Sequence, residues 1–326
     1  MRKFLIAALA LAVPAHAQEG RPPIDRTILH AQVILDHLGF GPGILDGRDG
    51  QSLKAALRAF QEMRGLQRTG RLDQPTLAAL HRYRALRPTV RLKLSAAALA
   101  GPYVYPFPKD PAKQAKLPVL GYRVPLEKLA EMFHTTPQVL AELNGPNARL
   151  VPGSPFTFPN ALPGSRAYPA NLDAAWRRTL NDLNVDARQP KGDRIVVDKS
   201  EGVLKVFAGE RLVAQFSATM GSEHDPLPIG RWKIQGVSHN PEFHYNPDLF
   251  WDVSDSKKDQ LLPPGPNGPV GVIWLDLSKP HYGIHGTPEP QTIGRAESHG
   301  CIRLTNWDAA RLSLMVKIGT PAIFQA

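Results

Sequence analysis

The sequence predicts a multidomain α+β protein, on three observations. Residues 26–83 carry apolar side chains at helical spacing, which predicts a small three-helix N-terminal domain. Residues 118–161 place two amphipathic helical segments between two strand-like runs, a β-α-α-β order. From residue 193 onward, short β-rich runs alternate with turn residues, which is typical of a β-rich sandwich. A chain of 326 residues exceeds the usual size of a single core, so two or three domains are expected.

The first seventeen residues, MRKFLIAALALAVPAHA, have the pattern of a secretory signal peptide. Arg2 and Lys3 give a positive start, an apolar run extends from Phe4 to Val13, and small residues precede a cleavage point after Ala17. That run is too short to cross a bilayer. We therefore expect a cleaved signal peptide over residues 1–17, a periplasmic location and no transmembrane anchor.

Charge and cysteine content narrow the classes of partner. The net charge of +10 indicates anionic surroundings. Export argues against nucleic acid, so wall polymers and membrane surfaces are the better candidates. The single cysteine, Cys301, cannot form an intrachain disulfide. In an oxidising compartment it either pairs between chains or keeps its thiol for chemistry, and we expect chemistry.

The N-terminal unit, residues 26–83, is expected to hold three helices, with Asp73 capping the third. Its motifs LGF, LDGRDG and ALRAFQ resemble the peptidoglycan-binding domain type 1. The resemblance implies a module that binds glycan or stem peptide.

Three further segments follow before the C-terminal region. Residues 84–117 are rich in Pro, Ala and Lys and predict a linker, or a strap packed on a neighbouring domain. In residues 118–161, the runs YRV and FTFP are the expected strands, and the unit resembles a LysM module, which binds N-acetylglucosamine in glycan strands. The usual Gly-Asp-Thr after the first strand is missing, which leaves glycan binding open. Residues 162–192 are expected to be a second linker.

The residues best suited to catalysis lie in the stretch HYGIHGTPEPQTIGRAESHGCIRL. A thiol becomes a good nucleophile when a base removes its proton, and histidines lie near Cys301 in the sequence. Gly300 allows close approach of the backbone to a substrate carbonyl. Three interpretations remain open from these residues: a buried structural cysteine, a cysteine nucleophile, or a zinc site made of His281, His285, His299 and Cys301.

The motifs HGT at 285–287 and SHGCIRL at 298–304 together resemble the signature of the L,D-transpeptidases with a YkuD-type catalytic domain. The run ATMGSEHDPLPIGRWKI resembles a strand-loop-strand of the same domain. The resemblance covers residues 193–326. One departure is Arg303, where the family often has Asn.

The resemblance implies a role for each catalytic residue. Cys301 is the nucleophile, and His285 is the base, oriented by the carbonyl of Gly286. His299 is expected to support the loop and the oxyanion site, where the amides of Gly300 and Cys301 are the expected donors.

Other residues of this region are expected to contact substrate. Arg303 suits a stem-peptide carboxylate, with a surface salt bridge as the alternative. Ser298 is expected to hold the loop, and Tyr282 to line the substrate site. No cofactor and no metal are expected, because zinc on Cys301 would occupy the nucleophile. The long segment 237–271 is expected to be a lid or binding wall, or to pack its aromatics onto the domain.

These expectations add up to an exported cysteine L,D-transpeptidase acting on peptidoglycan. Cys301 would attack a tetrapeptide stem, release D-alanine and pass the acyl group to an amine, giving a 3-3 crosslink or attachment of an outer-membrane lipoprotein. Water as acceptor would make the protein an L,D-carboxypeptidase or amidase. A catalytically silent peptidoglycan-binding protein is the alternative from a different class. An NlpC-type peptidase is disfavoured, because there the cysteine precedes the histidine.

Overall fold

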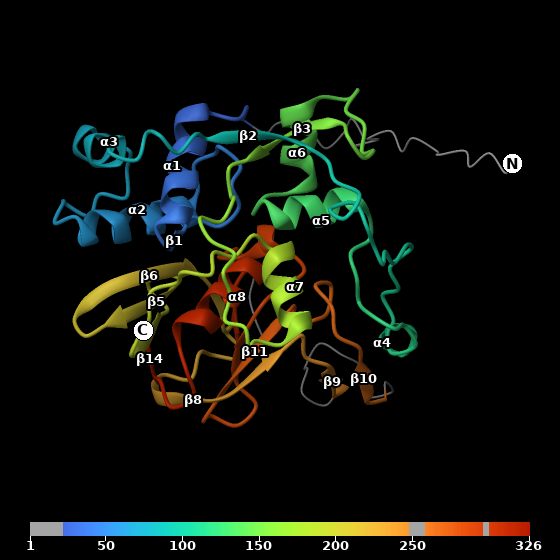
Figure 1. The fold of residues 1–326 in the computed structure, drawn as a ribbon. Coiled ribbons are helices and arrows are strands. Elements are labelled where there is room, and N and C mark those ends of the chain that lie inside the picture. Colours follow the sequence, from blue (N-terminus) through green and yellow to red (C-terminus); the bar gives the residue numbers. More distant parts are fainter. Residues whose placement is uncertain (1–21, 248–257, 296–299) are drawn as a thin grey trace, which may run out of the picture.

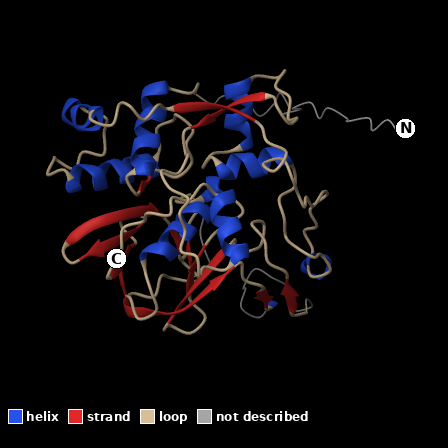
Figure 2. Cartoon of the chain, viewed as in Figure 1, coloured by secondary structure: helices blue, strands red, loops and turns tan. Residues whose placement is uncertain are grey.

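One large β-sheet organises the C-terminal half of the molecule. The computed structural model describes residues 22–247, 258–295 and 300–326. Figure 1 shows the N-terminal units stacked above this sheet, and Figure 2 shows most strands in the lower part of the view. The sheet order is β1-β6-β5-β4-β14-β8-β11-β12-β13-β7. Its strands are β1 (Phe40–Gly41), β4 (Arg194–Asp198), β5 (Val203–Ala208), β6 (Arg211–Ser217), β7 (Thr219–Met220), β8 (Gly230–His239), β11 (Ile273–Leu277), β12 (Gly283–His285), β13 (Ile302–Arg303) and β14 (Pro321–Gln325).

The predicted sandwich of two sheets is corrected to one continuous, curled sheet. The long strand β8 is the reason, because its two halves pair with different neighbours. Its first residues pair with β14, in the register Gly230 to Phe324, and its last residues pair with β11, in the register His239 to Ile273. The α+β class is confirmed.

Helices α7 (Ala174–Asp182) and α8 (Asn306–Met315) share the core of this sheet. Trp176 and Trp307 are fully buried there with strand residues such as Phe216 and Ile284. Thr305 caps α8, its side chain accepting a hydrogen bond from the amide of Asp308. The helix begins two residues after the SHGCIRL motif, which contains Cys301.

The N-terminal unit has the three expected helices, α1 (Arg26–His37), α2 (Gln51–Met63) and α3 (Gln74–His81). Asp73 caps α3 as predicted, accepting from the amide of Thr76. The unit also supplies strand β1, which pairs in parallel with β6 of the C-terminal sheet. The N-terminal unit therefore contributes one strand to the C-terminal sheet.

The β-α-α-β order is present, but its first strand lies elsewhere than predicted. It consists of β2 (Thr89–Lys93), α5 (Pro125–Met132), α6 (Pro137–Asn144) and β3 (Pro155–Pro159), with β2 and β3 antiparallel. The YRV segment, residues 122–124, forms no strand. Val90 and Leu92 pack on the core of the unit, since they alternate with polar residues in β2.

Residues 94–124 form a strap that connects β2 to α5 and contacts the C-terminal domain. The strap contains α4 (Pro111–Gln114), and Leu120 donates a hydrogen bond to the carbonyl of Pro264 and accepts one from the amide of Asn267, both at 2.9 Å. The segment predicted as a lid contains a hairpin of β9 (Phe243–Tyr245) and β10 (Gln260–Leu262). Residues 248–257 of it lie outside the described residues.

Three units meet at a buried cluster of charged residues, the junction cluster. Asp36 of α1 accepts hydrogen bonds from His134, which follows α5, and from Arg311 of α8, both at 3.0 Å. Arg311 also bonds the carbonyl of Asp36 at 2.7 Å. Burial alone would raise the pKa of Asp36, but His134 and Arg311 hold it well below its ordinary value. The cluster thus ties the N-terminal, β-α-α-β and C-terminal units together.

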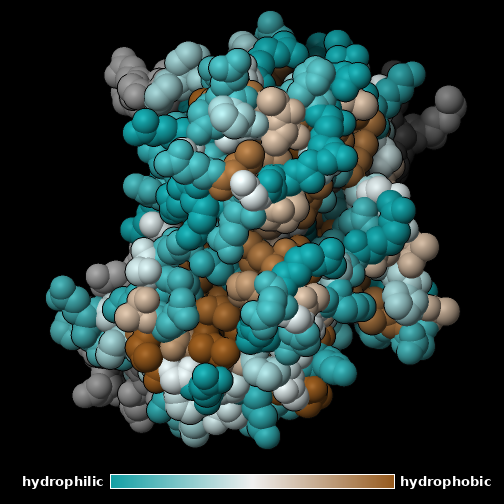
Figure 3. Space-filling model, turned by 90° about the vertical axis from the view of Figure 1, so that its left-hand side faces the viewer, coloured by the Kyte–Doolittle hydropathy of each residue, from teal (hydrophilic) through white to brown (hydrophobic). Residues whose placement is uncertain are grey.

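The outer surface is mainly hydrophilic on the side shown in Figure 3, with hydrophobic surface gathered in its middle and lower parts. The large exposed apolar side chains include Leu77, Ile229 and Ile318, which come from separate segments. No helix in the described part of the chain is long and apolar enough to cross a membrane.

Candidate active site

Strands β12 and β13 bring the segments that hold His285 and Cys301 together. They pair in parallel, with Ile284 opposite Ile302 and His285 opposite Arg303. Side chains alternate along a strand, so His285 and Arg303 share a face, and Cys301 directly precedes β13. The pairing therefore brings together two segments whose chemically active residues are sixteen positions apart in the sequence, 301 minus 285.

His285 is held as a neutral ring. It is 4% exposed, its Nδ1–H donates to the carbonyl of Gly286 at 2.7 Å, and the ring stacks on Trp274 with centroids 5.4 Å apart. Burial and, to a smaller extent, the charge of Arg303 lower its pKa to about 4, against an opposing effect of the Gly286 carbonyl. Since Nδ1 carries the proton, Nε2 keeps a lone pair and can accept one. The expected contact with Gly286 is present, and its catalytic role remains a prediction.

Cys301 is half-buried. Its Sγ lies 3.8 Å from the carbonyl oxygen of His281. Burial raises the pKa of Cys301, and a hydrogen bond from the backbone of Gly283 and the charge of Arg303 oppose that rise. A thiol with a raised pKa stays protonated near neutral pH, so it needs a base to become a nucleophile.

Gly300 and Tyr282 form the wall beside the thiol. Gly300 has a φ of +91°, and a Cβ there would lie 2.7 Å from the ring of Tyr282. Any side chain at this position would be strained and would also displace the ring. Burial raises the pKa of Tyr282, and the charges of Cys301 and Asp225 add to this. Tyr282 and Asp225 therefore face the thiol.

Two predicted residues, Ser298 and His299, lie outside the described residues. Arg303 is half-buried, and its charge affects the pKa of both His285 and Cys301. Its proposed contact with a substrate carboxylate remains a prediction. No group of three or more His, Cys, Asp or Glu side chains in the described ranges is arranged to hold a metal ion.

Sequence reasoning missed two residues that support the base, Asn306 and Glu131. Asn306 donates to Glu131 Oε1 at 2.7 Å, and its own Oδ1 accepts from the amide of Val272 at 3.3 Å. A Cβ on Gly286 would lie 2.0 Å from that Oδ1, so Asn306 packs directly on the residue that orients His285.

Asn306 and Glu131 differ in the sequence signal that each of them carries. Asn306 follows the SHGCIRL motif by two positions and begins α8, so it is suggested by position. Glu131 belongs to α5, 175 residues away from Asn306, and no local pattern links the two.

A neutral, buried imidazole on one strand and a thiol that directly precedes the paired strand suit a cysteine enzyme that transfers or hydrolyses acyl groups. The comparisons with known proteins identify the family within that class. Residues 192–324 match the YkuD family, described as L,D-transpeptidase catalytic domain, and residues 26–80 match a family described as "Putative peptidoglycan binding domain". The C-terminal part thus matches the YkuD-type L,D-transpeptidase catalytic domain and the N-terminal unit matches a peptidoglycan-binding domain, as predicted. The LysM resemblance remains a prediction.

Curated relatives share this C-terminal part. The "Putative L,D-transpeptidase YkuD" of Bacillus licheniformis is 56% identical over 127 residues, which are 39% of this chain and 62% of the relative. The "Putative L,D-transpeptidase in ATP synthase subunits region ORF 5" of Fuscovulum blasticum is 46% identical over 105 residues, or 32% and 54% of the two chains. The chain therefore spans little more than half the length of these two relatives.

Solved structures are similar at lower identity. An L,D-transpeptidase from Mycobacterium smegmatis is 23% identical, with a TM-score of 0.34 over 40% of this chain and 58% of that one. An L,D-transpeptidase from Xylanimonas cellulosilytica is 15% identical, with a TM-score of 0.39 over 94% and 96% of the two chains.

Proposed function

We propose that the protein is an exported L,D-transpeptidase that acts on peptidoglycan tetrapeptide stems. The observation that supports this most is the pairing of the strand that holds His285 with the strand that directly follows Cys301, with Nδ1 held by Gly286 and Nε2 left to accept a proton. Without that placement, the thiol would stay protonated and inert. The family of the catalytic domain supports the same chemistry.

The proposed reaction has two halves. His285 takes the thiol proton while Sγ attacks the carbonyl between the third and fourth stem residues. The peptide C–N bond breaks, the proton passes to the departing amine, D-alanine leaves, and a thioester remains on Cys301. An acceptor amine then attacks the thioester, the C–S bond breaks, and the amine's proton restores the thiol.

The surrounding residues suit this substrate. Arg303 is proposed to pair with a stem carboxylate, and Tyr282 to line the site. His299, Ser298 and the amides of Gly300 and Cys301 are proposed to form the loop and oxyanion site. The peptidoglycan-binding domain and the LysM-like unit favour an enzyme that works on assembled wall in the periplasm.

The acceptor is proposed to be an amine. A diaminopimelate side chain would give a 3-3 crosslink, and a lysine of an outer-membrane lipoprotein would give an attachment to the wall. Water as acceptor would give a carboxypeptidase or amidase instead.

Intact mass after mixing with a carbapenem tests the nucleophile. We expect a one-to-one adduct on the wild-type protein and none on Cys301→Ala, with circular dichroism showing that both are folded. Incubation with disaccharide tetrapeptides would then identify the acceptor from the products. A folded wild-type protein that forms no adduct and releases no D-alanine would refute the proposed function.

A further inference from the structure

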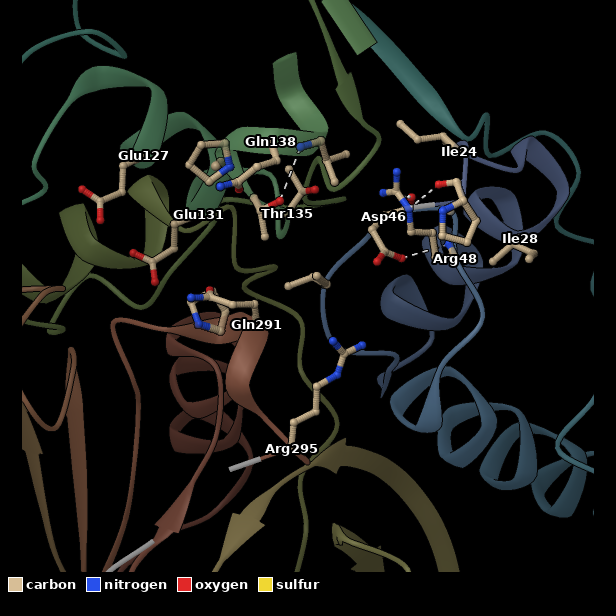
Figure 4. A pocket seen from close by; sticks show the side chains of 18 of the residues that line it. Ile24, Ile28, Asp46, Arg48, Glu127, Glu131, Thr135, Gln138, Gln291 and Arg295 are labelled. Atoms are coloured by element: carbon tan, nitrogen blue, oxygen red, sulfur yellow. Dashed lines mark hydrogen bonds between the residues drawn. The ribbon is translucent and has the colours of Figure 1, made fainter. Parts of the chain in front are cut away.

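A cavity of about 1050 Å³ lies where the three units meet. Figure 4 shows it from close by, with the N-terminal unit on one side, the β-α-α-β unit on another, and Gln291 and Arg295 of the C-terminal domain below. Neither Cys301 nor His285 lines it. The cavity is therefore distinct from the site of the Cys301 thiol.

The cavity presents charges of both signs. Arg295 extends toward it from below, while Glu127 and Glu131 line it from α5 (Figure 4). The guanidinium of Arg295 has no carboxylate within ion-pair distance in the described part of the chain. By contrast, Arg48 on the opposite wall is already paired with Glu142 at 2.6 Å. Arg295 is thus a cation of the cavity wall that a ligand can engage.

The acidic side is partly desolvated. Glu131 is 6% exposed, and burial raises its pKa to about 7, with hydrogen bonds from Tyr122 and Asn306 opposing that rise. Glu127 is paired with Arg123 at 2.7 Å, and Asn267 donates to it at 3.3 Å. A carboxylate in such a setting gains from a ligand cation, because little water competes for it.

The cavity is also connected to the catalytic residues. Its floor is the loop 288–295, which starts three residues after His285 and leads toward Cys301. Glu131 contacts Asn306, and Asn306 packs on Gly286, which orients His285. A ligand in the cavity would therefore lie against Glu131 and against the loop 288–295.

We propose that this cavity binds a peptide carrying a free primary amine and free carboxylates, namely a second peptidoglycan stem, while the donor stem reacts at Cys301. Arg295 pairs with a carboxylate of this peptide, and Glu127 and Glu131 face its ammonium group. The volume is ample for a peptide of a few residues. The choice of a stem peptide rests on the proposed function.

Calorimetric titration tests the site. The probe is the stem tripeptide L-alanyl-γ-D-glutamyl-meso-diaminopimelate, and the protein is the full chain with Cys301→Ala, which prevents turnover. We expect Arg295→Ala to weaken binding by about tenfold, as loss of a charge-assisted contact does, and Glu127→Gln by about threefold. The matched control is Arg84→Ala, which removes the same charge from an exposed residue outside the cavity and should change the Kd by less than about twofold.

The other outcomes are unambiguous. Absence of binding, or binding that Arg295→Ala leaves unchanged, would overturn the proposal, as would equal losses in Arg295→Ala and Arg84→Ala. Acylation by a carbapenem is measured separately, on the protein with Cys301 intact. Failure of the wild type to be acylated would count against the proposed function alone, because the titration needs no reactive thiol.

Discussion

The molecule contains two buried histidines that have closely similar settings but different hydrogen-bond partners. His134 is 2% exposed and stacks on Trp307, with ring centroids 5.0 Å apart, while His285 is 4% exposed and stacks on Trp274. The difference lies in the ring nitrogens. Both nitrogens of His134 face acceptors, the carboxylate of Asp36 and the carbonyl of Leu183 at 2.8 Å.

His285 has one such acceptor, the carbonyl of Gly286. Both ring nitrogens of His134 are thus used in hydrogen bonds, whereas His285 keeps one ring nitrogen for chemistry. Burial and an aromatic neighbour alone therefore do not decide the role. His134 is a structural bond between units, and His285 is the proposed base.

The largest effect expected is on the reaction, from His285→Ala. Loss of a general base typically slows a reaction by about 10²–10⁴-fold, so acylation by a carbapenem should slow by that amount. The free energy of unfolding should change much less. Stopped-flow acylation and urea denaturation on the same protein measure the two quantities. Acylation at the wild-type rate would show that His285 is not the base.

The variant His134→Ala should instead lower the free energy of unfolding and leave the reaction of the folded protein intact. Removing one partner from a buried charged network typically costs about 3–5 kcal/mol, because Asp36 and Arg311 lose part of their compensation. Urea denaturation measures this, and the folded fraction should still be acylated. His81→Ala is the matched control, since that exposed histidine is the last residue of α3 and does not belong to the junction cluster. Equal losses in both variants would contradict a special role for the junction cluster.

Glu131→Gln should raise stability at alkaline pH. The folded-state pKa is raised to about 7 from 4.5 by burial, so the unfolded state ionises first and the folded state loses stability as pH rises between these values. The glutamine avoids that loss, by an amount on the order of 3 kcal/mol near pH 8, with little difference near pH 4. Denaturation curves across this range measure it, beside Glu127→Gln. A variant less stable than wild type at every pH would show that the carboxylate itself is needed.

The pH dependence of acylation sharpens the contrast further. With the pKa of His285 lowered to about 4, the ring stays neutral from about pH 5.5 to 8, and the rate constant should be nearly constant there. Below pH 4 it should fall about tenfold per unit as the ring gains a proton. A rate that instead rises tenfold per unit from pH 6 to 8 would indicate a requirement for preformed thiolate.

The smallest effect is expected for Arg68→Gln. Arg68 pairs with Glu201 at 2.6 Å between the N-terminal unit and the catalytic domain, with side chains 40% and 24% exposed. Exposed pairs contribute less than about 1 kcal/mol and are screened by salt. Denaturation at low and high salt checks this, and a larger loss that salt does not reduce would point to a structural role beyond the ion pair.

The sequence was sufficient for the features that lie within one motif. HGT and SHGC identified the family, and periodicity located α1, α2 and α3. The strand β2 was missed because the Pro- and Ala-rich composition around it resembles a linker. Glu131 and the junction cluster were missed because their partners come from separate units, and local patterns hold no information about such contacts.

The pairing of β1 with β6 bears on how this chain can be divided. The two residues of β1 cover the outer edge of β6, and Leu212 of β6 is buried in the core of the N-terminal unit. A fragment trimmed to residues 192–324 would expose an unpaired strand edge and apolar side chains, which is a common cause of self-association. The wall-binding domain is thus also a protective cover, and the catalytic domain should be produced together with it.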